Sequence, residues 1–579
     1  MDQALLDASL LASLRQEAQA GAFALVARAN DDLVRLNEVL RSFGYYDAYI
    51  DIRLDGQSLE EPRLVERLEA EWEQRTQAGP INVQVAIDLG PLYHLGQVRL
   101  EGDLPAAVRQ AFSLQTGQPA LAATVLAAGQ AVLTALREAG YALAQVPAPE
   151  VLVLHASRTM DVTYTPDPGP RLAIGPVTIE GLEGLKEDYV QRRLGLEPGE
   201  MYSPSRLEQA RKELMEGGVL ASARFIPATA PDASGRLPLT LEVTERPPRV
   251  LRFAGAYASD EGGSLSASWT HRNLLGRAER LTLRADIGTL GATYTSEPSY
   301  LVSASLVKPD LLYRDNDLHL DLAAVREFLD AYDRDAITAG LSLQRRFSAD
   351  LNAGLGLGLE HSRVTQNEVT QDYHLAFLPL TLKYNGAGEL LDPHQGLRLD
   401  ARLAPTQVLS GDADNFLHLR ATGTGYLNLA RLFSGGATKG GSLLAGRLSI
   451  GRIFGASALN VPPDWRFYAG GGGSVRGFPY QSIGPKTASG EPQGGSNLLE
   501  TSLEWRQHLW GDWGMAVFVD TGAVSDQNFP GSGGWSVGAG AGVRYQTPVG
   551  PVRVDLATPL NNDAGDPDIQ FYIGIGQAY

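Results

Sequence analysis

The sequence predicts two regions of different fold class: repeated α+β units over residues 1–248, followed by a 16-stranded antiparallel transmembrane β-barrel over residues 249–579. The first observation is a helix, a glycine-containing turn and a strand, which recur in this order three times before residue 248. The second is a series of about sixteen segments after residue 248, each roughly nine to eleven residues long, in which apolar and polar residues alternate. A chain of 579 residues is also too long for one ordinary core.

Composition excludes several classes of function. The formal net charge is -18, and no run of lysine or arginine could follow a phosphate backbone, so nucleic acid is not an expected partner. Cysteine is absent, which excludes disulfides and thiolate metal sites and suits a protein that crosses an oxidising compartment. No apolar run reaches about 18 residues, so we expect no membrane-spanning helix. Residues 1–16 lack the features of a signal peptide, so an exported form of this sequence would be a mature or trimmed one.

The α+β region contains three units. Their helix-turn-strand segments read RSFGYYDAYIDI, LREAGYALAQVPAP and LMEGGVLASARFIPA, and a second strand follows each. Two units open with the matching strands YHLGQVRLEGD and LAIGPVTIEGL, which sets the predicted boundaries at residues 1–91, 92–170 and 171–248. The first unit is expected to lack its opening strand, because the sequence begins inside a helix. Residues 61–80 add a charged helical segment to this unit, which is most simply a solvated insertion.

Period-two alternation defines the barrel strands. In RLTLRADI, for example, Leu281 and Leu283 alternate with polar neighbours such as Arg284. A soluble β-sandwich also alternates, but its apolar face closes on a second sheet. An even number of strands of membrane-crossing length favours a closed transmembrane barrel that is apolar outside and polar in its lumen. The predicted strands begin near residues 249, 263, 279, 298, 316, 336, 350, 373, 396, 416, 442, 498, 514, 534, 551 and 569.

One long loop, residues 455–497, contains the sequence AGGGGSVRGFPY. A loop of this length without secondary structure is uncommon unless it is functional or disordered. Glycine allows the chain to turn sharply into a crowded lumen, and an arginine inside a barrel needs an anion. Alternation in WGMAVFVDTGAV directs Asp520 to the lumen, because a charge on the lipid face is costly. We therefore predict that Arg476 binds Asp520 through charge-assisted hydrogen bonds, as a structural rather than a catalytic pair.

Four motifs carry a resemblance to a known family. They are VRGF at residues 475–478, FVDTG at 518–522, NLLGRAE at 273–279 and GAGVRYQTPVGPVRVDLATPL at 540–560. Together they resemble the POTRA-barrel superfamily of outer-membrane assembly and secretion factors, and the resemblance covers essentially the whole chain. In that family the sixth extracellular loop folds into the lumen, and the arginine at its tip pairs with the aspartate of an FxDxG strand. The resemblance thus implies that Arg476, Gly477, Phe478 and Asp520 fix the loop.

The three N-terminal units look like POTRA domains, and with the aromatic-rich last strand IQFYIGIGQAY they are most similar to the TamA-type members. The resemblance implies a bacterial outer-membrane location with the POTRA-like units in the periplasm. It also implies unfolded outer-membrane or autotransporter clients, and a TamB-like inner-membrane-anchored partner that binds the POTRA-like units. Exposed sheet edges in such units can capture another chain by strand addition.

We expect the first barrel strand, near residues 251–257, to pair with the last, near residues 570–577. This junction is expected to be a weak lateral seam, through which a client strand passes into the lipid without leaving backbone groups unsatisfied. Two glycines in the last strand lower its strand propensity. The predicted seam residues are Leu251 and Phe253 in the first strand, and Phe571, Ile573, Gly574, Ile575 and Gly576 in the last.

Two alternatives stay open. In a secretion pore of the two-partner type, the client moves through the lumen, and the loop that carries Arg476 is a plug that swings aside. In an envelope-bridging scaffold, the POTRA-like units bind the inner-membrane partner, and the chain transports outer-membrane lipid rather than protein. These possibilities are not mutually exclusive.

The sequence gives little support to an enzyme. HExxH, GxSxG and Walker motifs are absent, and the nine histidines are scattered singly, so we expect no metal and no other cofactor. GLGLGLE and GAGAGVRY are interpreted as strands that have one face without side chains. Asp392 is interpreted as a turn former, and Trp505, Trp510 and Trp513 as part of an interfacial aromatic girdle.

Overall fold

The structure, a computed structural model, describes residues 1–15, 21–74, 81–388, 392–429, 441–526, 534–548, 550–561 and 568–579. Contacts divide the chain into two compact units. The first comprises residues 1–181, 194–216 and 223–243, and the second comprises residues 182–193, 217–222 and 244–579. In the described part of the chain, no helix is both long and apolar enough to cross a membrane.

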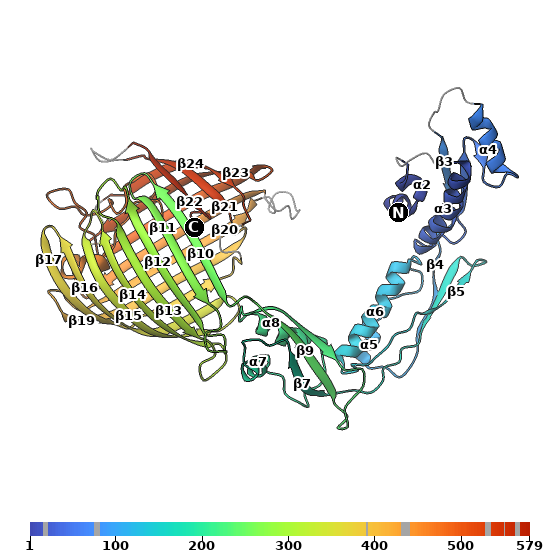
Figure 1. Ribbon diagram of the computed structural model, residues 1–579, viewed down its shortest axis with the longest axis horizontal. Coiled ribbons are helices and arrows are strands. Elements are labelled where there is room, and N and C mark those ends of the chain that lie inside the picture. Colours follow the sequence, from blue (N-terminus) through green and yellow to red (C-terminus); the bar gives the residue numbers. More distant parts are fainter. Residues whose placement is uncertain are drawn as a thin grey trace. The chain divides into compact units, whose positions relative to one another are not determined.

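Three small sheets with helices make up residues 1–248 (Figure 1). The elements are α1 (Asp2–Ala8), α2 (Leu10–Ser13), α3 (Ala22–Ser42), β1 (Tyr49–Leu54), β2 (Gln57–Ser58), α4 (Leu64–Glu73), β3 (Val83–Asp88), β4 (His94–Leu100), α5 (Ala106–Ala111), α6 (Ala122–Glu138), β5 (Glu150–Leu154), β6 (Thr159–Tyr164), β7 (Ile174–Glu180), α7 (Glu187–Leu194), α8 (Pro204–Met215), β8 (Leu220–Pro227) and β9 (Leu237–Glu245). The sheet orders are β2-β1-β3, β4-β6-β5 and β7-β9-β8. In the second and third sheets the opening strand pairs in parallel with the last strand, and among the described residues the first sheet has no such strand.

The charged segment at residues 61–80 is helical, but it is not simply a solvated insertion. Helix α4 covers most of it, and residues 75–80 lie outside the described residues. Leu64 and Leu68 are buried in one core with Leu36 and Leu40 of α3. Their spacing of four residues places both leucines on the same helix face, so this face packs inward while the charged face meets solvent.

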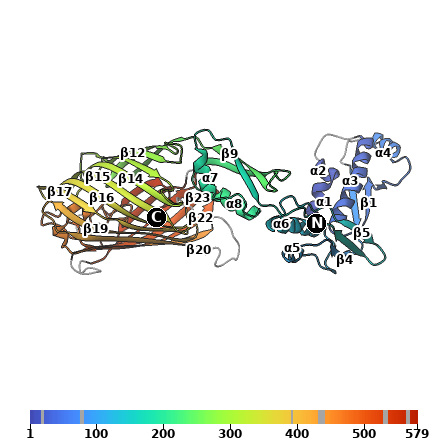
Figure 2. The same cartoon turned by 90° about the horizontal axis from the view of Figure 1, so that it is seen from below.

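The barrel closes from sixteen antiparallel strands, as predicted. The segments are β10 (Arg249–Ala258), β11 (Gly262–His271), β12 (Arg280–Leu290), β13 (Ser299–Lys308), β14 (Asn316–Phe328), β15 (Asp333–Arg346), β16 (Leu351–Gln366), β17 (Val369–Phe377), β18 (Leu380–Asn385), β19 (Gly396–Ser410), β20 (Phe416–Asn428), β21 (Ser442–Phe454), β22 (Asn497–Trp510), β23 (Trp513–Ser525), β24 (Ser536–Tyr545), β25 (Val552–Pro559) and β26 (Gln570–Ile575). Figures 1 and 2 show these strands side by side around the barrel.

One strand position is divided between two segments. β17 and β18 each pair with both β16 and β19, so they form a single interrupted strand, and the seventeen segments make sixteen strands. Pro379 lies in the interruption, and proline has no N–H to donate to the ladder. The eighth strand begins at residue 369, earlier than the predicted 373.

Side chains alternate between lipid and lumen as the sequence pattern predicts. On β23, Val517 and Val519 are 41% and 46% exposed, whereas Phe518 and Asp520 are each 1% exposed. The exposed valines face outward, where lipid would cover them, and the buried pair faces the filled lumen. The lumen-facing side chains of the wall are therefore covered, and the long loop described below covers them.

The NLLGRAE turn joins β11 to β12 and contacts helix α7 within the second unit. The Gly276 carbonyl accepts a hydrogen bond of 2.8 Å from the Lys186 backbone N–H, and Arg277 lies 2.9 Å from a carboxylate oxygen of Asp188. Arg193, whose side chain is 3% exposed, lies 2.6 Å from Asp310 in the next turn. Helix α7 is thus held to two turns at the end of the barrel where β10 begins.

The junction between β10 and β26 is much shorter than the other strand pairings. β10 pairs with β11 over ten residue pairs but with β26 over two, Tyr257 with Ile573 and Ala258 with Tyr572. The Ser259 backbone N–H adds one hydrogen bond of 3.0 Å to the Phe571 carbonyl. Among the described residues, no strand pairs with residues 249–256 on the side of β10 that faces away from β11.

Candidate functional site

The loop between β21 and β22, residues 455–496, folds back against the inner wall of the barrel. It contains two short 3-10 helices, η1 (Ala458–Asn460) and η2 (Pro463–Trp465). Loop side chains and wall side chains form one buried apolar cluster, which includes Phe467 and Phe478 of the loop and Phe416 and Val524 of the wall. Apolar burial therefore holds the body of the loop in the lumen.

The structure brings Arg476 and Asp520 together at the tip of this loop. Nε of Arg476 lies 2.7 Å from Oδ2 of Asp520, and Nη2 lies 3.0 Å from Oδ1, so the contact is bidentate. The Arg476 backbone N–H also donates to Oδ2 at 3.2 Å. Both side chains are almost fully shielded, with 2% and 1% exposure.

Two further carboxylates that sequence reasoning missed complete the environment of Arg476. Nη1 lies 2.8 Å from Glu504 on β22 and 3.4 Å from Asp555 on β25, and both carboxylates have no exposed surface. Arg544 lies 2.5 Å from Asp555, and Arg506 lies 2.7 Å from Glu504, so additional arginines balance the acids. Arg476 thus joins a buried network of alternating charges rather than a single pair.

The guanidinium of Arg476 also lies over an aromatic ring. Its central carbon is 3.3 Å from the ring centroid of Phe518, two residues before Asp520 on the same strand. This cation–π contact and the bidentate pair come from one strand face, because residues two apart in a strand point the same way. The Phe and Asp of the FVDTG motif therefore both bind one guanidinium.

Glycines in the wall make room for the loop tip. A Cβ atom at Gly538 of β24 would collide with the Arg476 carbonyl oxygen, and one at Gly522 of β23 would lie 2.6 Å from the Val475 side chain. Gly477 has a φ of +101° and packs against the backbone at Thr558. Gly538, the first alternate glycine of GAGAGVRY, therefore lies directly under the loop tip, whereas Gly540 faces the Phe518 ring and Gly542 faces Asp555 and Arg544. The strand pattern alone did not predict these contacts.

The remaining predicted loop residues connect the tip to the last strand and to the core. The Gly477 backbone N–H donates to the Tyr572 hydroxyl of β26 at 3.1 Å. Phe478 is 3% exposed in the apolar cluster. At the start of the tip, Gly470 and Gly471 have φ of +109° and +93°, in the left-handed region that glycine tolerates.

The structure places the predicted seam residues differently from the expected pairing of Leu251–Tyr257 with Gln570–Gln577. Leu251 and Phe253 are 60% and 74% exposed and have no partner in β26. Phe571, Ile573, Gly574 and Ile575 belong to β26, but only Ile573 is paired to β10, and Phe571 contacts Ser259 just beyond it. The expected pairing is wrong in extent. Gly574 and Ile575 pair with β25 but not with β10, and after Ile575 the chain leaves the wall at Gly576, which has a φ of +90°.

Residues 577–579 enter the lumen after this turn. The Tyr579 ring lies between two guanidinium groups, 5.5 Å from Arg447 and 5.6 Å from Arg506, and its carbonyl accepts a hydrogen bond from Arg506 at 3.1 Å. Gln577 accepts a hydrogen bond from Arg544, which also belongs to the network around Arg476.

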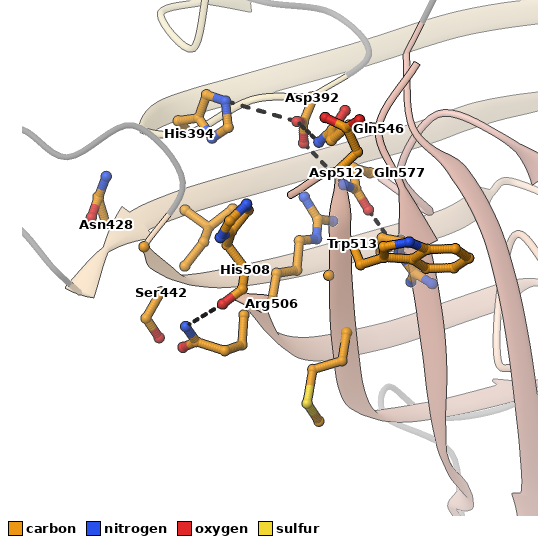
Figure 3. Close-up of a pocket in the computed structure, with 16 residues that line it drawn as sticks. Asp392, His394, Asn428, Ser442, Arg506, His508, Asp512, Trp513, Gln546 and Gln577 are labelled. Atoms are coloured by element: carbon orange, nitrogen blue, oxygen red, sulfur yellow. Dashed lines mark hydrogen bonds and ion pairs between the residues drawn. The ribbon is translucent and has the colours of Figure 1, made fainter. Parts of the chain in front are cut away.

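A small cavity of about 80 Å³ lies beside these residues (Figure 3). Asp392 points into it and accepts hydrogen bonds from Gln546 at 2.6 Å and from Gln577 at 2.9 Å. Asp392 is therefore more than a turn former, because it ties a hairpin to the segment that follows β26.

Of the tryptophans assigned to an aromatic girdle, Trp510 and Trp513 are 68% and 44% exposed near the same end of the barrel. No cluster that could hold a metal ion occurs among the described residues.

Comparisons with known proteins agree with this architecture. The Omp85 superfamily domain matches residues 273–579, and a POTRA model, described as a surface antigen variable number repeat, matches residues 172–246. The chain is similar to the outer membrane protein assembly factor BamA of Neisseria meningitidis, with 21% identity over 86% of this chain and 68% of that protein. A second relative, BamA of Neorickettsia risticii, is 22% identical over 71% of this chain and 56% of its own length.

A solved structure also matches. The crystal structure of BamA from Haemophilus ducreyi lacking POTRA domains 1–3 has a TM-score of 0.70 and 20% identity, and the match covers 83% of this chain and all of that one. It shares the fold: POTRA-like domains followed by a 16-stranded barrel. The relatives are named BamA, so the TamA-type assignment stays a prediction. The chain is a bacterial outer-membrane barrel with periplasmic POTRA domains, it is not an enzyme, and it belongs to the Omp85 superfamily.

Proposed function

We propose that this protein assembles outer-membrane β-barrel proteins by pairing a client strand with the open edge of β10. The observation that carries the proposal is the two-pair junction between β10 and β26, against ten pairs between β10 and β11. The relatives named above carry the name outer membrane protein assembly factor, although the chain spans only 68% and 56% of their lengths.

The open edge has the chemistry that a client strand needs. Residues 249–256 present backbone N–H and C=O groups at the lipid boundary, where unsatisfied polar groups are costly. Leu251 and Phe253 flank this edge as large exposed apolar side chains that would contact a lipid-facing client strand. A client strand that pairs here satisfies its backbone while it enters the lipid, and the pairing requires little sequence specificity.

We further propose autotransporter-type clients, a TamB-like inner-membrane-anchored partner at the POTRA-like units and contact with outer-membrane lipid, as the TamA-type resemblance implies. An unpaired sheet edge in the second unit supports a partner of this kind: β5 is an edge strand, and Val151 and Leu152 on it are 47% and 60% exposed. The envelope-bridging scaffold for lipid transport uses the same edge. The secretion pore requires the lumen loop to leave its present contacts, and the buried network around Arg476 opposes this movement.

Reconstitution of the purified chain into liposomes tests the proposal. We expect the chain to accelerate membrane insertion of an urea-unfolded autotransporter barrel, measured by the client's resistance to heat-induced unfolding in gels. Liposomes that contain an unrelated closed barrel are the control. Equal client insertion in both would contradict an assembly function, and lipid transfer without client insertion would favour the scaffold.

A further inference from the structure

The lumen loop has a second buried charge cluster, at its start rather than at its tip. Asp464 in η2 has no exposed side-chain surface, and its Oδ2 lies 2.9 Å from Nε of Arg334 on β15. This contact is an ion pair and lacks the geometry of a hydrogen bond. Arg334 also lies 3.4 Å from Glu327 on β14 and 3.4 Å from Glu360 on β16. One wall arginine is thus shared between a loop carboxylate and two wall carboxylates.

The residues that follow Asp464 extend this contact along the wall. The indole N–H of Trp465 donates to Glu360 at 3.3 Å, and the indole ring lies edge-on to Phe377 and Phe416, at 5.2 and 5.5 Å. Arg466 donates to Gln366 of β16 at 2.9 Å. Three successive strand positions of the wall, from β15 to β17, therefore meet the loop through charged, polar or aromatic side chains.

The two clusters lie on different sides of the barrel. The first involves β22, β23 and β25, and the second involves β14 to β17. In the closed strand order, three strand positions lie between the second cluster and β22, and five lie between β25 and β14 in the other direction. Between residues 464 and 476 the loop lies along the inner wall, where Phe467 stacks on His418 of β20 and lies against Gly451 of β21, so the loop connects two wall regions that are far apart in the strand order.

We propose that Asp464, Arg334 and Glu360 form a second anchor, so that loop 455–496 is a brace fixed to both sides of the lumen rather than a plug hinged at one end. The two anchors have opposite polarity: at the tip the loop supplies an arginine to wall acids, and at residue 464 it supplies an acid to a wall arginine. A buried charge that loses its partner is strongly disfavoured, so each anchor holds without the other. One consequence rests on the proposed assembly function. Because the loop stays in the lumen during assembly, the client passes through the seam.

Ion conductance in planar lipid bilayers tests the brace without any client. The variants are Arg334→Gln, Arg476→Ala and the double variant, and a chain that lacks residues 457–494 defines the conductance of an open lumen. Arg345→Gln is the matched control, because Arg345 lies on the same strand but faces outward and is exposed. We expect each single variant to retain the low conductance of the unmodified chain. The double variant should approach the loop-deleted level.

Two results would overturn the brace. One is full loop-deleted conductance from Arg476→Ala alone, and the other is a double variant that conducts no more than Arg476→Ala. If Arg334→Gln does not fold, as judged by heat-modifiable migration in gels, Asp464→Asn replaces it in the same series, because it removes the loop's charge and leaves Arg334 paired with wall acids. Client insertion is measured separately, so failure of the brace and failure of the assembly function give different results.

Discussion

Replacement of Arg476 by alanine is expected to detach the loop tip and to abolish most client insertion, while the barrel remains folded and its conductance stays low. Arg476 is the cation that Asp520, Glu504 and Asp555 share, and its side chain is 2% exposed. Removing one partner of a buried ion pair costs about 3 to 5 kcal/mol, because the remaining charges stay desolvated and uncompensated. Lysine should rescue only in part, since it cannot make the bidentate contact.

Protease accessibility of the loop in membranes measures detachment, and client insertion is measured in the same samples. Arg452→Ala is the matched control, because Arg452 lies at the end of β21 just before the loop but faces outward. A second pair of variants tests the tip without changing charge: Gly538→Ala should displace the Arg476 carbonyl, whereas Gly288→Ala on β12 meets open space. A tip that stays protected in both Arg476→Ala and Gly538→Ala would contradict this interpretation of the site.

A disulfide between strands β10 and β26 is expected to stop client insertion reversibly. Tyr257 and Ile573 are direct antiparallel partners in the seam, and the chain contains no cysteine, so the two introduced thiols would be alone. Opposed residues in an antiparallel pair have Cα atoms about 4.5 to 5.5 Å apart, within the range that a disulfide spans. Oxidation should prevent β26 from separating from β10, so that a client cannot widen the seam, and reduction should restore insertion.

The control for this experiment is a disulfide on the other side of the same strand. Ala254 and Ser266 are direct partners between β10 and β11, where the pairing is complete, so Ala254→Cys with Ser266→Cys should have little effect. Insertion that continues at the normal rate with the oxidised Tyr257–Ile573 pair would show that clients do not use the seam.

The barrel could be predicted because the signal for each strand, the alternation of apolar and polar residues, lies within that strand's own sequence. Alternation such as Leu281 and Leu283 against Arg284 reflects one lipid face and one wet face, and that contrast is visible in a short window of sequence. Asp520 could be assigned to the lumen by the same rule. Its pairing with Arg476 rested on weaker signals, the need of an arginine inside a barrel for an anion and the motif resemblance, because a loop has no period that fixes where its side chains point.

What the sequence did not reveal depends on contacts between distant segments. Glu504 and Asp555 occupy lumen positions of their strands, where most acidic residues are simply solvated, so no local signal marks them as partners of Arg476. The same holds for Asp464 and Arg334. From the sequence, Gly538 was interpreted only as part of a strand face without side chains. The structure explains the glycine, because a Cβ atom there would collide with the loop tip.

The extent of the seam was mispredicted for a related reason. The last strand was expected to pair as far as residue 577 in spite of its two glycines, but Gly576 turns the chain inward, and the Tyr579 ring lies near the guanidinium groups of Arg447 and Arg506. These stabilising contacts lie on β21 and β22, far from β26 in the sequence. Local patterns cannot show that a terminal segment gains more from the lumen than from its neighbour in the wall.

The most direct test of the central claim is disulfide capture of a stalled client strand in membranes. One cysteine replaces Ala256 on the open edge of β10, and in a second variant one cysteine replaces Asp321, which is exposed on the lumen side of β14. Asp321 is the better lumen reporter, because Asp520 is covered by the loop tip. Capture at position 256 and not at 321 is the result that lateral assembly through the seam predicts, whereas capture at 321 and not at 256 would contradict it and place the client in the lumen.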